Sequence, residues 1–205
     1  MRLKQIAILT LAVAVSGCGR AAPAASQLSV NGHAVSIALY QALVTAEQHR
    51  AEQTGVRADA TSPAGRQRLA SIEASVIHEL VRDAVVEQLA QARGIRVTPA
   101  QVEQQLAVAA RAFGGPSPFE QAVRQTGLAT SDFATLLRYR LLETQLAQVN
   151  AGEVTLQIDN AVSRARVVVT IGPCADGRSY PACLATPGSD PQNQTGPRPS
   201  ARPFN

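Results

Sequence analysis

The sequence contains no tryptophan, and aromatic residues make up only 3% of its 205 residues. A core with so few rings must be filled by leucine, valine, isoleucine and alanine, which favours close-packed helices over an aromatic-rich sheet. Hydrophobic residues account for 45% and charged residues for 17% of the chain. These values suit one globular domain with tails.

Basic side chains are almost all of one kind, because Lys4 is the only lysine. The formal net charge is +4, and the arginines are dispersed along the chain without forming a basic stripe. Nucleic-acid-binding proteins usually concentrate positive charge on one face. We therefore expect no nucleic-acid partner.

Few residues are of a type and spacing that would support catalysis or metal binding. The three histidines lie in separate predicted elements and are interpreted as surface or hydrogen-bonded residues; they are His33, His49 and His78. Three carboxylates repeat every four residues and are interpreted as a solvated helix face offset by Arg82; they are Glu79, Asp83 and Glu87. There is no phosphate-binding glycine loop and no Ser-His-Asp order. We expect no catalytic centre, no metal and no cofactor.

The first residues have the form of an export signal. Arg2 and Lys4 precede an apolar run, residues 6–15, that is too short to span a bilayer as a mature helix. The run ends in Val-Ser-Gly-Cys, which resembles the lipobox of bacterial lipoproteins, so we expect residues 1–17 to be a signal peptide and Cys18 to be lipidated. Two acyl chains suffice for stable attachment. The alternative is an ordinary cleaved signal with a free Cys18; residues 18–27 read as a tether.

The longest periodic segment lies between Ser62 and Gly94. Its apolar residues recur at three- and four-residue spacing, the pattern of one helix face; they are Leu69, Ile72, Val76, Ile77, Leu80, Val81, Ala84, Val85 and Leu89. Ser62 and Pro63 are typical of a helix start, and Gly94 is typical of a helix end. Such a helix is about 45 Å long, so shorter elements must pack along it.

Shorter elements are predicted on both sides of this helix. The Asn31-Gly32 pair between apolar residues predicts a small strand or hairpin over 28–35. Capping residues, glycines and prolines mark the ends of the other predicted elements. One helix is predicted from Ser36 to Arg50 or Thr54, and another over 99–113 with a Thr98–Gln101 capping box. Three further helices are predicted over 119–126 (capped by Ser117), 132–149 (capped by Thr130 or Ser131) and 155–163, and a strand is predicted over 165–171. The fold class is mainly α, built on one long helix, with a small β element from the N-terminal strand and the late strand.

Two cysteines follow the late strand in the loop CADGRSYPAC; they are Cys174 and Cys183. An exported chain leaves the reducing cytoplasm, so we expect a disulfide between them, with a free thiol pair as the alternative. Metal binding is disfavoured because no histidine and no second cysteine pair is near. Residues 185–205 are rich in proline and poor in apolar side chains, which predicts a disordered tail.

The order of elements resembles the N-terminal chaperone domain of SurA- and PrsA-like exported foldases, over residues 28–150. The residues that carry the resemblance are Val30-Asn31-Gly32, the junction Gly94-Ile95-x-Val97-Thr98, and then Phe119, Gly127 and Asp132-Phe133. The resemblance implies a cradle of helices that binds unfolded or nascent exported polypeptides. The candidate peptide-binding residues are Phe113, Phe119, Phe133 and Tyr139; the alternative is that these rings are ordinary core.

The family also implies a parvulin-type prolyl isomerase domain, and here the sequence departs from it. Residues 151–184 look like the lead-in helix and first strand of that domain, but Val167 stands where the family has a histidine. Few apolar residues follow Ile171, so we expect no isomerase activity. The expected function is an extracytoplasmic, lipid-anchored chaperone-like module. The alternative is a scaffold lipoprotein that docks one specific folded partner, and the oligomeric state stays open.

Overall fold

The computed structural model describes residues 27–149 and 153–185. The expected signal peptide, Cys18 and the tail from residue 186 onward lie outside the described residues. The described part holds six α-helices and three short strands. The helices are α1 (Ile37–Gln53), α2 (Pro63–Ala92), α3 (Pro99–Ala112), α4 (Pro116–Gln125), α5 (Thr130–Val149) and α6 (Val154–Arg164). The fold is therefore mainly helical, as the sequence predicts.

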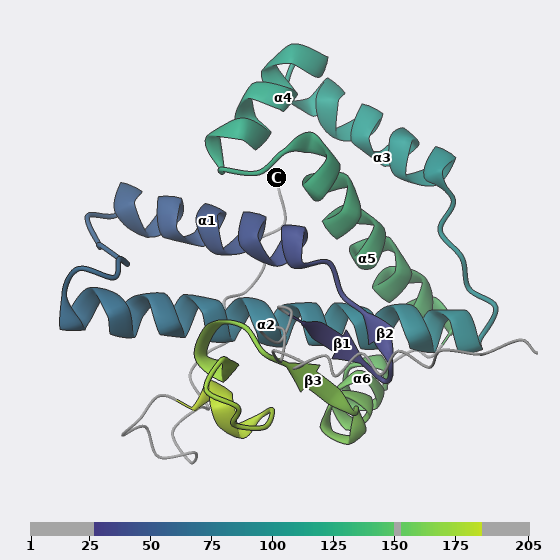
Figure 1. The fold of residues 1–205 in the computed structure, drawn as a ribbon. Helices are drawn as coiled ribbons and strands as arrows, with labels where there is room; N and C mark the ends of the chain where they lie inside the picture. The colour runs from purple at the N-terminus through teal and green to yellow at the C-terminus, as the bar shows by residue number, and fades with distance from the viewer. Residues whose placement is uncertain (1–26, 150–152, 186–205) are drawn as a thin grey trace, which may run out of the picture.

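Helix α2 is the axis of the molecule. Figure 1 shows α1 lying alongside it, α3 and α4 above it, and α6 and β3 below it. Ser62 begins the helix, because its Oγ accepts a hydrogen bond from the Gly65 amide at 2.9 Å, and Pro63 occupies the first turn. Five residues of the predicted apolar face are buried, and the other four are partly buried against the same core. The buried five are Val76, Ile77, Leu80, Val81 and Val85, and the partly buried four are Leu69, Ile72, Ala84 and Leu89.

The predicted hairpin is present and joins a small antiparallel sheet. Its strands, β1 (Leu28–Val30), β2 (His33–Ala34) and β3 (Val167–Val169), lie in the order β2-β1-β3. Asn31 and Gly32 both have positive φ, +54° and +83°, as a tight hairpin turn requires. The Asn31 side chain accepts from the Arg166 amide at 2.9 Å and donates to Gln88 Oε1 at 2.7 Å. One turn residue thus links the hairpin to β3 and to α2.

The core consists of three apolar clusters. The largest packs β1, α1 and the middle of α2 against β3 and the two cysteines of the late loop. The second joins the end of α2 to α5 and α6; its members are Val86, Ala90, Leu142, Leu146 and Ile158. The third lies between α3, α4 and α5, with Ala110, Phe119 and Val123 at its centre. Residues 153–185 therefore share the core of the helical domain.

Three predicted boundaries are wrong. Helix α4 begins at Pro116 rather than at residue 119, because a proline in the first turn needs no amide donor and Gly115 supplies the preceding turn at φ +133°. Helix α5 includes Thr130 and Ser131, which were expected as caps. Strand β3 is limited to 167–169, since its partner β1 offers only the three positions of 28–30.

Candidate functional site

Helices α3, α4 and α5 form a lobe above α2 in Figure 1, called here the α3–α5 lobe. Three phenylalanines meet inside it. The Phe113 and Phe119 ring centroids are 5.8 Å apart at 66°, and those of Phe119 and Phe133 are 5.6 Å apart at 77°. Both contacts are edge-to-face, a favourable arrangement for aromatic pairs. These three residues are called the aromatic cluster.

Glycines at both ends of α4 set the path of the chain through the lobe. Gly114 and Gly115 have φ angles of +86° and +133°, which reverse the chain between α3 and α4. After α4, a Cβ built on Gly127 would lie only 3.1 Å from the Cα of Ala46 in α1. Leu128 then packs against both the main core and the lobe. The lobe is therefore held against α1 at one close contact.

The aromatic cluster is buried at its centre and open at its edge. Phe119 is 5% exposed and Phe133 is partly buried, whereas Phe113, at the end of α3, is 42% exposed. Val108 on the same helix is 45% exposed. Both side chains are therefore apolar surface that solvent, or a partner, can reach. The cluster thus combines a fixed interior with an accessible apolar edge.

Tyr139, the fourth candidate, lies apart from the cluster, in the contact between α2 and α5. Burial raises the pKa of its hydroxyl, and the Arg138 guanidinium carbon lies 5.7 Å from its ring centroid. Arg138 pairs with Glu87, and Arg82 donates two hydrogen bonds to Glu143. These ion pairs hold α5 against α2. The structure therefore gathers three of the four candidate rings, while Tyr139 packs against the two core clusters that α2 shares with α5.

The carboxylates of α2 are not a uniformly solvated face, contrary to the sequence interpretation. Glu79 is exposed, but Glu87 is half-buried in its ion pair. Asp83 is half-buried beside α5, and burial, reinforced by the negative charge of Glu79, raises its pKa to about 7. The sequence pattern could not show this, because α5 packs here through contacts between residues distant in the chain.

A groove of about 460 Å³ lies between α1, α2 and the segment after β3, and it is called the Tyr40 groove. Its lining residues are Tyr40, Gln41, Val44, Thr45, Glu73, Thr170, Ile171, Gly172 and Ala175. The Tyr40 side chain is buried, and its hydroxyl makes no hydrogen bond of normal geometry among the described residues. Burial, followed by the nearby Glu73 charge, raises the pKa of that hydroxyl, and burial raises the pKa of Glu73.

Sequence reasoning missed this groove, although one signal for it exists. Glu73 lies three and four residues before Val76 and Ile77, so a charged residue occupies the apolar face of α2. Gly172 gives no such signal. The backbone of Gly172 covers Tyr40 and Glu73, since a Cβ on Gly172 would lie 2.7 Å from the Tyr40 hydroxyl. That approach depends on β3 returning to β1 from the far end of the chain.

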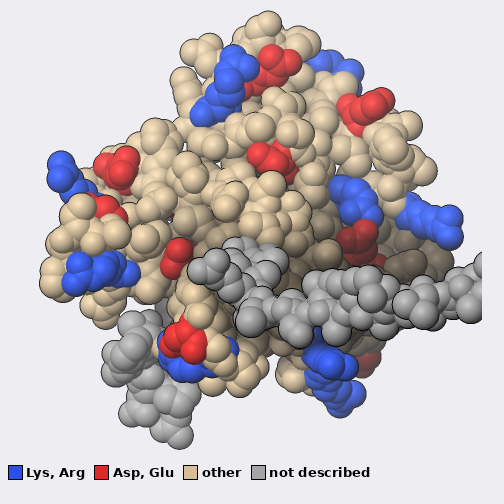
Figure 2. All heavy atoms as spheres, in the orientation of Figure 1, with Lys and Arg blue, Asp and Glu red and all other residues tan. Residues whose placement is uncertain are grey.

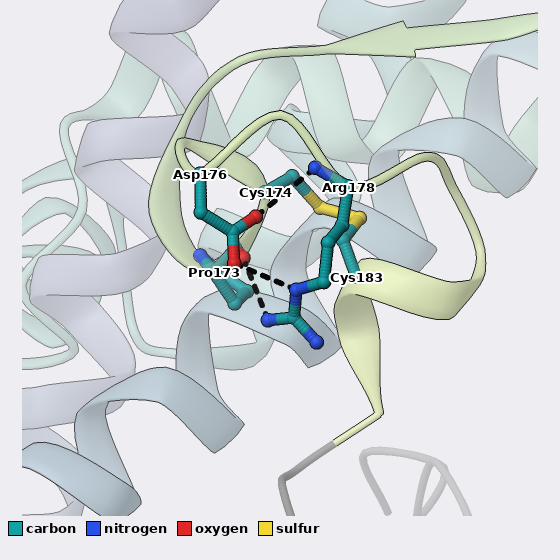
Figure 3. The surroundings of a disulfide bond; sticks show 5 residues. All are labelled: Pro173, Cys174, Asp176, Arg178 and Cys183. Carbon is teal, nitrogen blue, oxygen red and sulfur yellow. Dashed lines mark hydrogen bonds and ion pairs between the residues drawn. A yellow bond between two sulfur atoms is a disulfide. The ribbon is translucent and has the colours of Figure 1, made fainter.

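The expected disulfide joins Cys174 and Cys183, with their Cα atoms 4.9 Å apart. Both cysteines are fully buried in the main core against α2. Figure 3 shows the Asp176 carboxylate facing Arg178 across the loop, and this ion pair is 2.6 Å long. The loop is thus bound covalently and packed into the domain.

The histidines do not meet. His33 lies in β2, His49 in α1 and His78 in α2, where its Nδ1 is 3.1 Å from the Tyr180 hydroxyl. Burial lowers the pKa of His78. The described residues contain no group of three potential metal ligands. Val167 lies in β3, paired with Val30.

Charge and hydropathy add little to these features. The face visible in Figure 2 carries basic and acidic side chains interspersed, with wide uncharged areas between them. In the part of the chain that the structure describes, no helix combines the length and the apolar character that crossing a bilayer demands.

Comparison with models of known protein families identifies a family for this chain. A family model described as SurA-like N-terminal domain matches residues 3–147, which is most of the chain. Neither the curated proteins nor the solved structures contain a match to this sequence.

Proposed function

The chain belongs to the family of SurA-like N-terminal domains, which indicates a chaperone-like role, and from this premise we propose that it binds unfolded or nascent exported polypeptides. The observation that carries the proposal is the aromatic cluster with its exposed edge at Phe113. The cluster lies in a lobe that projects from the α2 axis (Figure 1). Apolar segments of an unfolded client would bury their side chains against this edge.

The exposure of Phe113 favours a role of the aromatic cluster in binding over a purely structural role. Phe119 already fills the centre of the lobe core and is only 5% exposed. Phe113 adds one edge-to-face contact to it and leaves much of its own ring in water. Burying that remaining surface against a client would contribute about 1 kcal/mol. Such a small increment from each contact suits weak binding of varied sequences.

The test is suppression of aggregation of a chemically unfolded model protein by the full chain carrying Cys18→Ser. The chain with Cys18→Ser alone should suppress the light scattering of the aggregating client. Adding Phe113→Ser should raise the molar excess of the chain needed for the same suppression by about fivefold, because roughly 1 kcal/mol of binding free energy is lost. The matched control is Leu156→Ser, which removes a 65% exposed apolar side chain from α6. It should leave suppression unchanged, and both variants should keep the wild-type circular dichroism spectrum.

Two outcomes would overturn the proposal. One is the absence of suppression at several-fold molar excess of the chain. The other is an equal loss in Phe113→Ser and Leu156→Ser, which would mean that general surface hydrophobicity is responsible. Capture of a single folded partner, with no affinity for unfolded clients, would instead support the scaffold function.

We further propose that this module acts by binding alone and is held at an extracytoplasmic membrane face through Cys18. The module that we describe offers apolar surface and no convergent set of histidines, which supports binding rather than isomerisation. Mass spectrometry of the protein isolated from membranes tests the anchor: diacylglycerol on Cys18 is expected, and an unmodified cysteine would refute it. A prolyl isomerisation assay should give the uncatalysed rate.

A further inference from the structure

The Tyr40 groove has the chemistry of a small, charged binding site. Of the nine residues that line it, Glu73 is the only charged one. Val44 and Ile171 provide apolar walls, and Thr45 adds a hydroxyl. A volume of about 460 Å³ lies within the range of sites that accept small ligands or single side chains.

A buried polar group at this site makes no hydrogen bond of normal geometry. The Tyr40 side chain is only 7% exposed, and its hydroxyl interacts with the Glu73 carboxylate without meeting the geometry of a hydrogen bond to any described residue. Buried hydroxyls are nearly always satisfied, because an unmade hydrogen bond is costly. Since the hydroxyl lies beside the half-buried Glu73 carboxylate, an incoming donor could bind both groups together.

We propose that the Tyr40 groove binds a cationic side chain, lysine or arginine, of a polypeptide client. The carboxylate of Glu73 would pair with the ammonium or guanidinium group, and the Tyr40 hydroxyl would accept a hydrogen bond from the same cation. The aliphatic stem of the client side chain would lie along Val44 and Ile171. Among the residues that the structure describes, no basic side chain lines the groove to compete for Glu73.

Gly172 keeps this site closed on one side. Its φ is +54°, and a Cβ on it would lie 2.7 Å from the Tyr40 hydroxyl and 3.2 Å from the Cβ of Glu73. A side chain at residue 172 would therefore displace the two groups that face the ligand. The proposal rests on polypeptide binding as the function, and it adds a selectivity for positive charge that the aromatic cluster does not supply.

The experiment measures binding of fluorescent extended peptides to the full chain carrying Cys18→Ser. Three peptides share an apolar sequence and differ at one central position, which is lysine, arginine or glutamine. The two cationic peptides should bind about tenfold more tightly than the glutamine peptide, as expected for a partly buried charged hydrogen bond. Glu73→Gln should reduce this preference to less than about twofold. The matched control Glu103→Gln removes the same charge from an exposed position on α3 and should leave the preference intact.

Tyr40→Phe separates ligand binding from a structural role. Because the hydroxyl makes no hydrogen bond of normal geometry in the free protein, its removal should change the melting temperature little, yet it should weaken binding of the cationic peptides by about threefold. Equal affinity for all three peptides, or an unchanged preference in Glu73→Gln, would overturn the proposal. Such a result would leave polypeptide binding standing if the glutamine peptide still binds and Phe113→Ser weakens it. If no peptide binds and no aggregation is suppressed, the proposed function itself fails.

Discussion

The contact between Gly127 and α1 allows one prediction to be worked out with an internal control. Gly127 has φ +85°, and a Cβ there would lie 3.1 Å from the Cα of Ala46 and 3.6 Å from its Cβ. Gly114 has almost the same backbone, φ +86°, but a Cβ there would meet nothing within 4 Å. Alanine at the two positions therefore imposes the same backbone strain, and only one of the two adds a close contact.

The expected magnitudes follow from these two terms. A residue with a side chain in the left-handed region costs about 1 kcal/mol, so Gly114→Ala should lose about 1 kcal/mol of unfolding free energy. In Gly127→Ala the backbone of α1 must also shift, and overpacking of this kind adds about 1–2 kcal/mol. We therefore expect Gly127→Ala to lose about 2–3 kcal/mol. For a domain of this size the melting temperatures should fall by about 3 °C and 6–10 °C respectively.

Urea denaturation followed by circular dichroism measures both variants. Hydrogen exchange locates the effect, because Gly127→Ala should raise exchange rates in α4 and in the middle of α1 around Ala46. Equal losses in the two variants would refute the reasoning, since they would mean that the lobe does not press on α1. A larger loss in Gly114→Ala would do the same.

Three further changes test other parts of the structure. Phe119→Ala should lower the free energy of unfolding by about 3 kcal/mol, because it empties the centre of the lobe, while Phe113→Ala should cost about 1 kcal/mol; denaturation curves compare the two. The pKa of Asp83 is raised from 3.8 to about 7, so the folded state binds this proton more tightly than the unfolded state, and stability should fall as pH rises from 4 to 8. The difference in unfolding free energy between these pH values that is due to Asp83 should be roughly 2–4 kcal/mol. Asp83→Asn should remove this difference, as melting curves at each pH would show. Replacing both Cys174 and Cys183 by serine should cost roughly 2–3 kcal/mol in the chain-entropy model, and an unchanged denaturation midpoint would contradict it.

Local signals in the sequence predicted most of the helical architecture. Ser62, Pro63 and Gly94 bound α2 as expected, and the Thr98–Gln101 capping box is present with a 2.8 Å hydrogen bond from the Thr98 amide to Gln101 Oε1. These signals work because each depends on a few neighbouring residues and the backbone. The Asn31-Gly32 turn is predictable for the same reason.

Features that depend on distant residues were not predictable. The pairing of β3 with β1 joins residues 167–169 to 28–30, and no local pattern specifies that partner. Asp83 reads as a surface carboxylate until α5 lies beside it. The same holds for the Tyr40 groove, since Gly172 reaches Tyr40 only through the path of β3. The four candidate rings follow from the binding cradle that the family resemblance implies, but only the packing of α3, α4 and α5 separates Tyr139 from the other three.

The pairing of Leu28 with Val169 places the first described strand beside the strand that leads into the disulfide loop. Antiparallel strands joined at their outer ends open one hydrogen bond at a time when those ends are pulled apart. A load applied to the chain before Leu28 would therefore act first on this small sheet, whereas a load applied after residue 185 would act first on the buried disulfide loop.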